Sequence, residues 1–169
     1  MLDAVKRRLP DLTAAAEAIL AAETYHWWAG DCDEARAIKA TCGVDQGCPL
    51  SPVLFACVIA DPLDQLCAEL RARNPGALVL SYLDDIYICC APEHAGFAVD
   101  RARALFAPLG LELRFGENKT QIWCPNPATV VPGVPDVPRV TSLPCVGATL
   151  SCAQNAGIAR LDVAGAQPP

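Results

Sequence analysis

Two adjacent aspartates, Asp84 and Asp85, interrupt an otherwise apolar stretch, and this feature constrains the fold more than any other. Residues 77–80 before them and residues 86–90 after them are apolar and rich in Val, Ile, Leu and Tyr. Two short apolar runs that flank polar residues predict a β-hairpin, with the acids at or beside its turn. Because Asp is an ordinary turn residue, the pair taken alone also fits a solvated turn.

The two runs are apolar at consecutive positions, so both faces of the hairpin are predicted to be buried. A buried carboxylate needs a partner or a metal ion. Two carboxylates held close together repel each other, and a hard divalent cation removes that conflict. The sequence therefore favours a Mg²⁺ site at Asp84 and Asp85, with Mn²⁺ as the alternative ion.

Three motifs occur in a fixed order along the chain. Residues 43–55 read Gly-Val-Asp-Gln-Gly-Cys-Pro-Leu-Ser-Pro-Val-Leu-Phe, residues 82–85 read Tyr-Leu-Asp-Asp, and residues 110–120 contain Gly-Leu-Glu-Leu followed by Asn-Lys-Thr. They resemble the Gln-Gly-x-Pro-Leu-Ser-Pro, Tyr-x-Asp-Asp and Gly-Leu-x-Leu-Asn-x-x-Lys-Thr motifs of reverse transcriptases. The resemblance is strongest to polymerases of non-LTR (LINE-like) retrotransposons, with group II intron enzymes as near relatives.

The resemblance implies an RNA-directed DNA polymerase that uses two-metal nucleotidyl transfer. Asp84 would bind metal directly and Asp85 would assist. Lys119 would lie near the phosphates as a proton donor, although an exposed turn lysine fits the sequence equally well. The implied partners are an RNA template, a DNA primer and a deoxynucleoside triphosphate. The residues implied to contact template or substrate are Gln46, Gly47, Pro49 and Tyr82.

One element of the family pattern is missing from the sequence. Reverse transcriptases carry a further metal-binding aspartate on a strand that precedes a helix, and residues 1–10 resemble that helix. We therefore expect a truncated palm domain that lacks most of the fingers and thumb and is inactive alone. The competing hypothesis is a non-catalytic, retroelement-derived interaction domain that keeps the palm fold and binds another protein. The formal net charge of −6 favours this second hypothesis, because nucleic-acid-binding surfaces are basic.

The expected fold class is α+β: a ferredoxin-like antiparallel sheet, as in a polymerase palm, with helices on one face. We expect a partial palm at 1–124, a Pro-rich linker or extended edge segment at 125–144, and a possible primer-grip strand with a frayed tail at 145–169. The helices are predicted at residues 1–9, 11–22, 51–73 and 92–106, with a kink or a restart of the third helix at Pro62. Further strands are predicted at 35–42, 111–115 and 120–124.

The aromatic residues at positions 25–28 are interpreted as an anchor that holds a helix against a sheet; stacking on nucleic-acid bases is the alternative. No apolar run approaches the ~20 residues of a membrane-spanning helix. The charged N-terminal residues lack the apolar segment of a signal peptide. A soluble intracellular protein without a membrane partner is the expectation.

Overall fold

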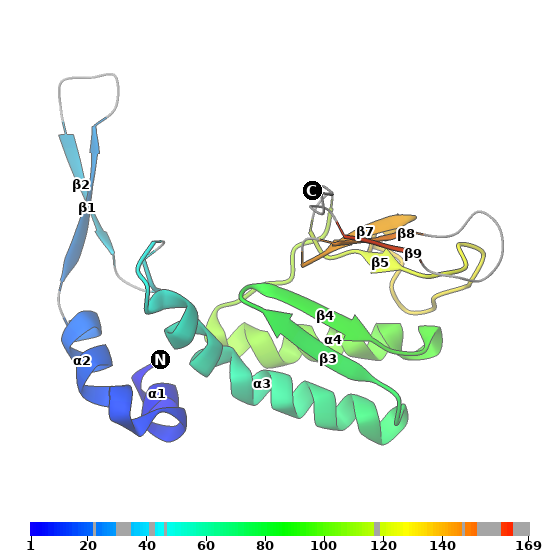
Figure 1. Cartoon of the computed structure of the whole chain (residues 1–169), viewed down its shortest axis with the longest axis horizontal. Coiled ribbons are helices and arrows are strands. Elements are labelled where there is room, and N and C mark those ends of the chain that lie inside the picture. The colour runs from blue at the N-terminus through cyan, green and yellow to red at the C-terminus, as the bar shows by residue number, and fades with distance from the viewer. Residues whose placement is uncertain are drawn as a thin grey trace, which may run out of the picture. The chain divides into compact units, whose positions relative to one another are not determined.

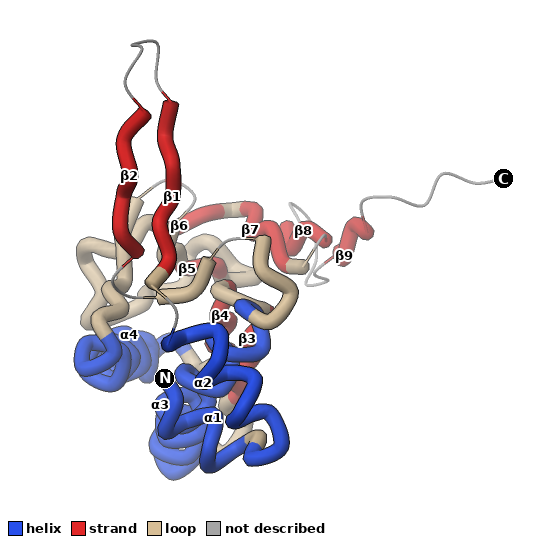
Figure 2. The backbone as a smooth tube through the Cα atoms, turned by 90° about the vertical axis from the view of Figure 1, so that its left-hand side faces the viewer, coloured by secondary structure: helices blue, strands red, loops and turns tan. Residues whose placement is uncertain are grey.

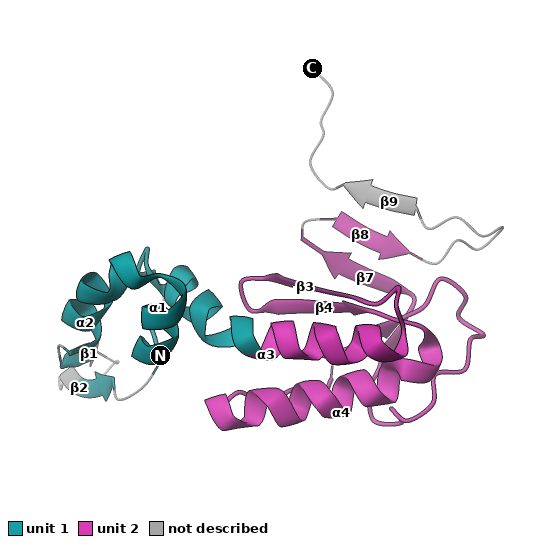
Figure 3. Ribbon diagram, turned by 90° about the horizontal axis from the view of Figure 1, so that it is seen from below, with its two compact units in different colours: residues 1–61 teal, residues 62–169 magenta. Residues whose placement is uncertain are grey.

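The chain forms helices and strands in two compact units, Met1–Asp61 and Pro62–Pro169. Figure 1 shows the computed structural model, and Figure 3 colours its two units. The residues that the structure describes are 1–21, 23–29, 35–40, 43–45, 47–116, 119–146, 148–151 and 160–163.

The first unit begins with two short helices, α1 (Leu2–Arg8) and α2 (Thr13–Ala21), which a 3₁₀ turn, η1 (Pro10–Leu12), connects. Proline lacks a backbone N–H and therefore ends α1, and the run of alanines that follows favours helix. Both helices confirm the sequence-based predictions. Their apolar sides pack on the start of the next helix, and this core cluster contains Ala4, Val5, Ala16, Leu54 and Cys57.

An antiparallel ribbon follows, made of β1 (Thr24–Ala29) and β2 (Ala35–Ala40). It extends away from α1 and α2, as Figure 2 shows. The side chains of Tyr25 and Trp27 are 47% and 73% exposed. The interpretation of these aromatic residues as a buried anchor is therefore wrong for Tyr25 and Trp27, because a two-stranded ribbon leaves a face of β1 uncovered.

Helix α3 (Ser51–Arg73) contains Pro62 in its interior. Ser51 is buried and Pro52 occupies an early helical position, where its missing N–H costs nothing. The predicted restart at Pro62 is wrong, since the helix continues through it. Ile59 before the proline and Leu66 after it are both buried, and this packing offsets the one backbone hydrogen bond that the proline removes.

The second unit contains the predicted hairpin, β3 (Leu78–Tyr82) and β4 (Asp85–Cys89), followed by η2 (Pro92–His94), α4 (Ala95–Phe106) and η3 (Ala107–Leu109). The hairpin lies along α3 and α4 in Figure 3. Arg101 of α4 donates two hydrogen bonds to the Glu69 carboxylate of α3, at 2.6 and 2.7 Å. The buried hydrophobic residues among the described part of this unit are Leu66, Leu70, Ala77, Ala98, Ala102, Phe106, Val134 and Val137.

Short strands complete the second unit. The parallel pair β5 (Ile122–Trp123) and β6 (Arg139–Val140) is separate from an antiparallel sheet of β7 (Ser142–Cys145), β8 (Ala148–Ser151) and β9 (Arg160–Val163). The strand predicted at 111–115 is wrong: only an isolated bridge joins Phe115 to Thr120 there. The predicted strand at 120–124 is confirmed in shorter form by β5.

The described residues thus form mixed helix and strand structure with small separate sheets, of two, two, two and three strands. This mixture of helices and small sheets is consistent with a reverse transcriptase domain, while the ferredoxin-like arrangement of the sheet stays a prediction. Within the described ranges, the helices are all too short or too polar to cross a membrane.

Candidate functional site

The two aspartates lie at the tip of the β3–β4 hairpin. Tyr82 pairs with Asp85 across the strands, so Leu83 and Asp84 form a two-residue loop. Leu83 has a φ of 56°, and a positive φ at the first loop residue is what tight hairpin turns require. Asp84 and Asp85 are both exposed. The hairpin therefore presents two adjacent carboxylates to solvent at its turn.

The prediction that the hairpin is buried on both faces is wrong. Leu78, Leu80 and Tyr82 point to one face, and their side chains are 38%, 50% and 56% exposed. The opposite face, with Val79, Ile86 and Ile88, is half-buried. The sheet has only two strands, so apolar residues on its outer face remain uncovered in the described part of the chain. The aspartates consequently have access to water.

Tyr87 is the nearest described partner of the hairpin acids. It follows Asp85 by two positions in β4, so both side chains lie on the same face. Its hydroxyl donates to Asp85 Oδ2 at 3.5 Å. Burial raises the pKa of the Tyr87 hydroxyl, and a hydrogen bond from the backbone of Val146 opposes that shift. Tyr87 therefore acts as a neutral hydrogen-bonding group beside the acids.

The Gln-Gly loop belongs to the first unit. Gly47 is exposed with a φ of 90°, a conformation that favours glycine, and an added Cβ there would meet open space. Pro49 is exposed as well. Gln46 lies outside the described residues. The loop thus offers accessible backbone at Gly47, as close approach to a ligand requires.

Hydrogen bonds fix the loop onto the start of α3. The Ser51 hydroxyl donates to the Asp45 carbonyl oxygen at 2.6 Å, and the Cys48 amide donates to the same oxygen at 3.3 Å. The Asp45 carboxylate lies 3.0 Å from His26 Nε2 of β1. Hydrogen bonds from the Leu50 backbone and the Ser51 side chain lower the pKa of the Cys48 thiol.

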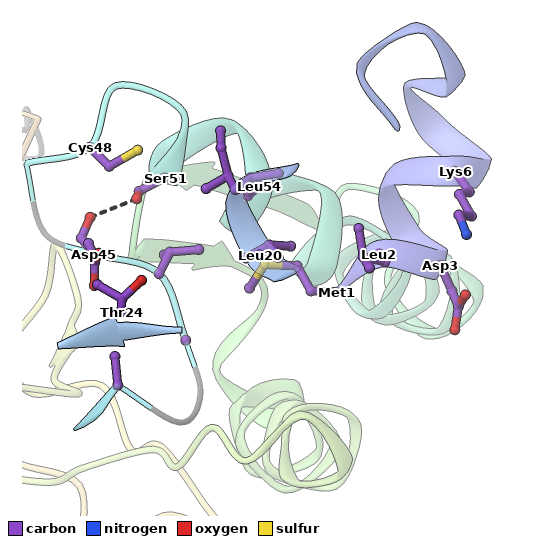
Figure 4. Close-up of a pocket in the computed structure, with 14 residues that line it drawn as sticks. Met1, Leu2, Asp3, Lys6, Leu20, Thr24, Asp45, Cys48, Ser51 and Leu54 are labelled. Atoms are coloured by element: carbon purple, nitrogen blue, oxygen red, sulfur yellow. Dashed lines mark hydrogen bonds between the residues drawn. The ribbon is translucent and has the colours of Figure 1, made fainter. Parts of the chain in front are cut away.

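A cavity of about 590 Å³ opens beside this loop within the first unit. Asp45, Cys48 and Ser51 line it on the loop side, and Figure 4 shows Leu20, Leu54 and Met1 on the other side. The hairpin residues Tyr82, Asp84 and Asp85 belong to the second unit. The structure therefore describes the predicted site residues as two groups, one in each unit.

Lys119 occupies an exposed turn of the second unit. Its amide donates to the Gly116 carbonyl at 3.2 Å. In the described ranges, no ion pair joins Lys119 to Asp84 or Asp85. Its role at the phosphates stays a prediction.

The donor set at the hairpin suits a hard cation only in part. Both side chains supply oxygen, which Mg²⁺ prefers, and proteins commonly bind this ion through one or two carboxylates plus substrate phosphates. Among the described residues, no group of three His, Cys, Asp or Glu side chains is close enough to hold a metal ion. Asp84 and Asp85 therefore offer two carboxylates at the hairpin, fewer protein ligands than a complete metal site has.

The sequence motifs do not single out two residues of the hairpin. Leu83 is the variable position of its motif, although its place in a two-residue turn implies a positive φ. Tyr87 lies outside the motif, although the two-residue period of a strand puts it on the face of Asp85. The contact between Tyr87 and Val146 has no local signal, because 59 positions separate them in the sequence.

A family model matches most of the chain. The family described as reverse transcriptase (RNA-dependent DNA polymerase) matches residues 8–150. This range contains both the Gln-Gly loop and the β3–β4 hairpin. Searches of curated proteins and of solved structures returned no match.

Proposed function

This chain belongs to the reverse transcriptase family, and we propose that it is part of an RNA-directed DNA polymerase in which Asp84 and Asp85 are the catalytic acids. The observation that supports this role most directly is the pair of adjacent, solvent-accessible carboxylates at the turn of β3–β4. Polymerisation brings a highly charged triphosphate to the acids, so the acids must be reachable from solvent. The exposed hairpin tip meets this requirement.

In the proposed reaction, Asp84 and Asp85 would hold Mg²⁺, with Mn²⁺ as a substitute. Bound metal ions would lower the pKa of the attacking primer hydroxyl and would stabilise the negative charge on the leaving pyrophosphate. Tyr82 pairs with Asp85 across the hairpin and would contact the primer end. Gly47 would let the template or nucleotide approach its backbone closely. Lys119 would donate a proton to the pyrophosphate, and Gln46 and Pro49 would contact template or substrate.

We further propose that the chain derives from a retrotransposon of the non-LTR type and that residues 1–124 are part of a ferredoxin-like palm. Residues 125–144 would connect this palm to a primer-grip strand within 145–169. The 169-residue chain would be inactive alone. Supporting this, the described residues bring no third metal-binding side chain to Asp84 and Asp85. Full activity would then need a further acid in addition to Asp84 and Asp85.

A second candidate function is a non-catalytic interaction domain. The observation in its favour is the uncovered apolar face of the hairpin, where Leu78, Leu80 and Tyr82 are 38–56% exposed. Contiguous exposed apolar side chains often mark protein interaction sites. This candidate predicts a bound protein at the hairpin and no dependence of binding on the aspartates.

Nucleotide binding separates the two candidates. We would titrate the 169-residue chain with a deoxynucleoside triphosphate, with and without Mg²⁺, by isothermal titration calorimetry. The polymerase proposal expects weak binding that needs Mg²⁺ and is lost in Asp84→Asn. The matched control is Asp100→Asn, an exposed acid of α4 whose side chain is 75% accessible, and it should leave binding unchanged. Binding that is absent, or equal in both variants, would favour the interaction domain.

Primer extension tests the inactivity of the isolated chain. We expect no Mg²⁺-dependent extension of a DNA primer on an RNA template by the purified 169-residue chain. Extension that disappears in Asp84→Asn would refute the inactivity and would support the assigned catalytic acids at the same time. Extension that persists in Asp84→Asn would contradict the role of this residue.

A further inference from the structure

The β1–β2 ribbon presents exposed aromatic side chains on one of its two faces. Tyr25 pairs with Lys39 across the ribbon, and Trp27 pairs with Ala37. Because side chains alternate along a strand, these four residues share one face, which we call the aromatic face. Each strand of the ribbon packs mainly on the other, and Figure 2 shows the ribbon extending away from α1 and α2. The side chain of Trp27 is accordingly 73% exposed.

The opposite face of the ribbon contacts the Gln-Gly loop. His26 lies between Tyr25 and Trp27 in β1, so its side chain points to this opposite face. The Nε2 atom of His26 lies 3.0 Å from Oδ1 of Asp45 in the loop. This contact holds one face of the ribbon against the loop and leaves the aromatic face on the other side.

Polar contacts hold the ring of Tyr25 in place. Its hydroxyl donates to Glu23 Oε2 at 3.1 Å, and the Lys39 ammonium lies over the ring, 6.0 Å from its centroid. Lys39 also forms an ion pair with Glu23. Both charged side chains are exposed, so the pair contributes little stability and Lys39 can exchange Glu23 for another anion. The aromatic face thus combines a fixed ring with a cation that a phosphate can reach.

The spacing of the two rings suits the bases of a single strand. Residues two positions apart on a β-strand are separated by about 7 Å, about twice the ~3.4 Å rise per base of a stacked strand. Trp27 and Tyr25 can therefore each stack on one base of an extended strand. Ala37 lies opposite Trp27 and is small, which leaves space beside the indole ring.

A second protein chain fits the aromatic face less well than a nucleic acid does. A specific protein interface covers about 800 Å² of each partner. Tyr25 and Trp27 are the large side chains of the face, and together they offer at most about 500 Å². A stacked base needs only one ring. Reverse transcriptase domains also bind nucleic acid in general, which favours this class of ligand.

We propose that the aromatic face of β1–β2 is a binding site for single-stranded nucleic acid, with one base on Trp27, another on Tyr25 and a backbone phosphate at Lys39. Stacking does not read the edges of the bases, so the site accepts strands of any sequence. Its functional meaning rests on the proposed polymerase activity, in which the bound strand would be unpaired template. The binding itself uses neither the hairpin aspartates nor a metal ion.

Fluorescence anisotropy of short labelled strands tests the site. The 169-residue chain is titrated in EDTA against RNA, DNA of the same sequence, and an abasic DNA of the same length. The abasic strand keeps the phosphates and lacks the bases, so we expect it to bind at least about tenfold more weakly than the intact DNA. Tighter binding of RNA would assign the site to the template, and tighter binding of DNA would assign it to the primer or product strand.

Replacement of Trp27 tests the stacking itself. Trp27→Ala should weaken binding of the intact strand about tenfold, and Trp27→Phe, which keeps an aromatic ring, should stay within about threefold of the unchanged chain. Trp27 is mostly exposed, so neither variant should alter the circular dichroism spectrum. The matched control is Ile38→Ala. Ile38 is another exposed apolar residue of the ribbon, but it pairs with His26 and lies on the opposite face, so binding should not change.

Several results would refute the site. These are equal binding of the abasic and intact strands, no binding of any strand, and an equal loss of affinity in Trp27→Ala and Ile38→Ala. Analytical ultracentrifugation adds a further test. A dimer that dissociates in Trp27→Ala would assign the aromatic face to a second copy of the chain and would also refute the proposal.

Failure of this site is distinguishable from failure of the proposed function. Strand binding that depends on Trp27, without Mg²⁺-dependent nucleotide binding, would keep the stacking site and remove the catalytic role of Asp84 and Asp85. Conversely, Mg²⁺-dependent nucleotide binding without strand binding at Trp27 would remove the stacking site and leave the catalytic role in place.

Discussion

Replacement of Leu83 by glycine should stabilise the hairpin. Leu83 has a φ of 56°, and a left-handed backbone costs a residue with a Cβ about 1–2 kcal/mol, whereas glycine adopts it freely. Glycine also increases the entropy of the unfolded chain, which costs about 0.4–1 kcal/mol. The side chain of Leu83 is 50% exposed, so its removal loses little buried area. The net expectation for Leu83→Gly is a gain of about 0.5–1 kcal/mol.

The assay is thermal unfolding followed by circular dichroism, together with hydrogen exchange at the amides of the hairpin. For a chain of this size the gain corresponds to a rise in Tm of about 1–4 °C. Leu80→Gly is the matched control, because Leu80 is also 50% exposed but lies in the extended strand β3. Leu80→Gly should destabilise the protein. A loss of stability in Leu83→Gly as large as that in Leu80→Gly would refute the assignment of strain to the turn.

Three further predictions concern packing and thiol reactivity. Gly96→Ala should lower the free energy of unfolding by about 1 kcal/mol, because the added Cβ would lie 3.1 Å from Gly133 Cα. This crowding should outweigh the better helix propensity of alanine. Chemical denaturation measures the free energy of unfolding, and a stabilised variant would contradict the prediction. Leu70→Ala should lower the free energy of unfolding by about 2–5 kcal/mol in the same assay, since Leu70 is fully buried in α3. A smaller loss would mean that the surrounding residues collapse around the smaller side chain. Between pH 6 and 8, iodoacetamide should modify Cys48 before Cys90. Hydrogen bonds at the start of α3 lower the pKa of the Cys48 thiol, whereas burial raises the pKa of the Cys90 thiol. Mass spectrometry that finds Cys90 modified first would refute this order.

The hairpin could be predicted from the sequence because its signal is local. Two apolar runs around a polar pair define the strands, and the short separation fixes the two-residue turn that places Asp85 opposite Tyr82. The exposure of the hairpin had no such local signal. Apolar residues on both faces show that a strand can be covered, but whether Leu78 and Leu80 are covered depends on segments elsewhere in the chain.

Contacts between residues that are far apart in the sequence could not be predicted from the sequence either. Nothing in residues 142–151 predicts a contact between Val146 and Tyr87. Likewise, no residue near Glu69 in the sequence predicts its hydrogen bonds with Arg101. Pro62 illustrates a different limit. Its local tendency to interrupt a helix is real, but the buried residues on both sides of it stabilise one continuous α3.

We propose that Asp84 and Asp85 form a divalent metal site, and paramagnetic relaxation by Mn²⁺ bound at the hairpin is the most direct test of this site. We would add Mn²⁺ to the isotope-labelled 169-residue chain and follow the paramagnetic broadening of its amide signals. We predict that the amide signals of Leu83, Asp84 and Asp85 broaden at the lowest Mn²⁺ concentrations. Asp84→Asn should raise the concentration needed by about tenfold, since fewer charged ligands mean weaker binding, whereas Asp100→Asn should not. Broadening that begins at other exposed acids, or that is unchanged in Asp84→Asn, would contradict a metal site at Asp84 and Asp85.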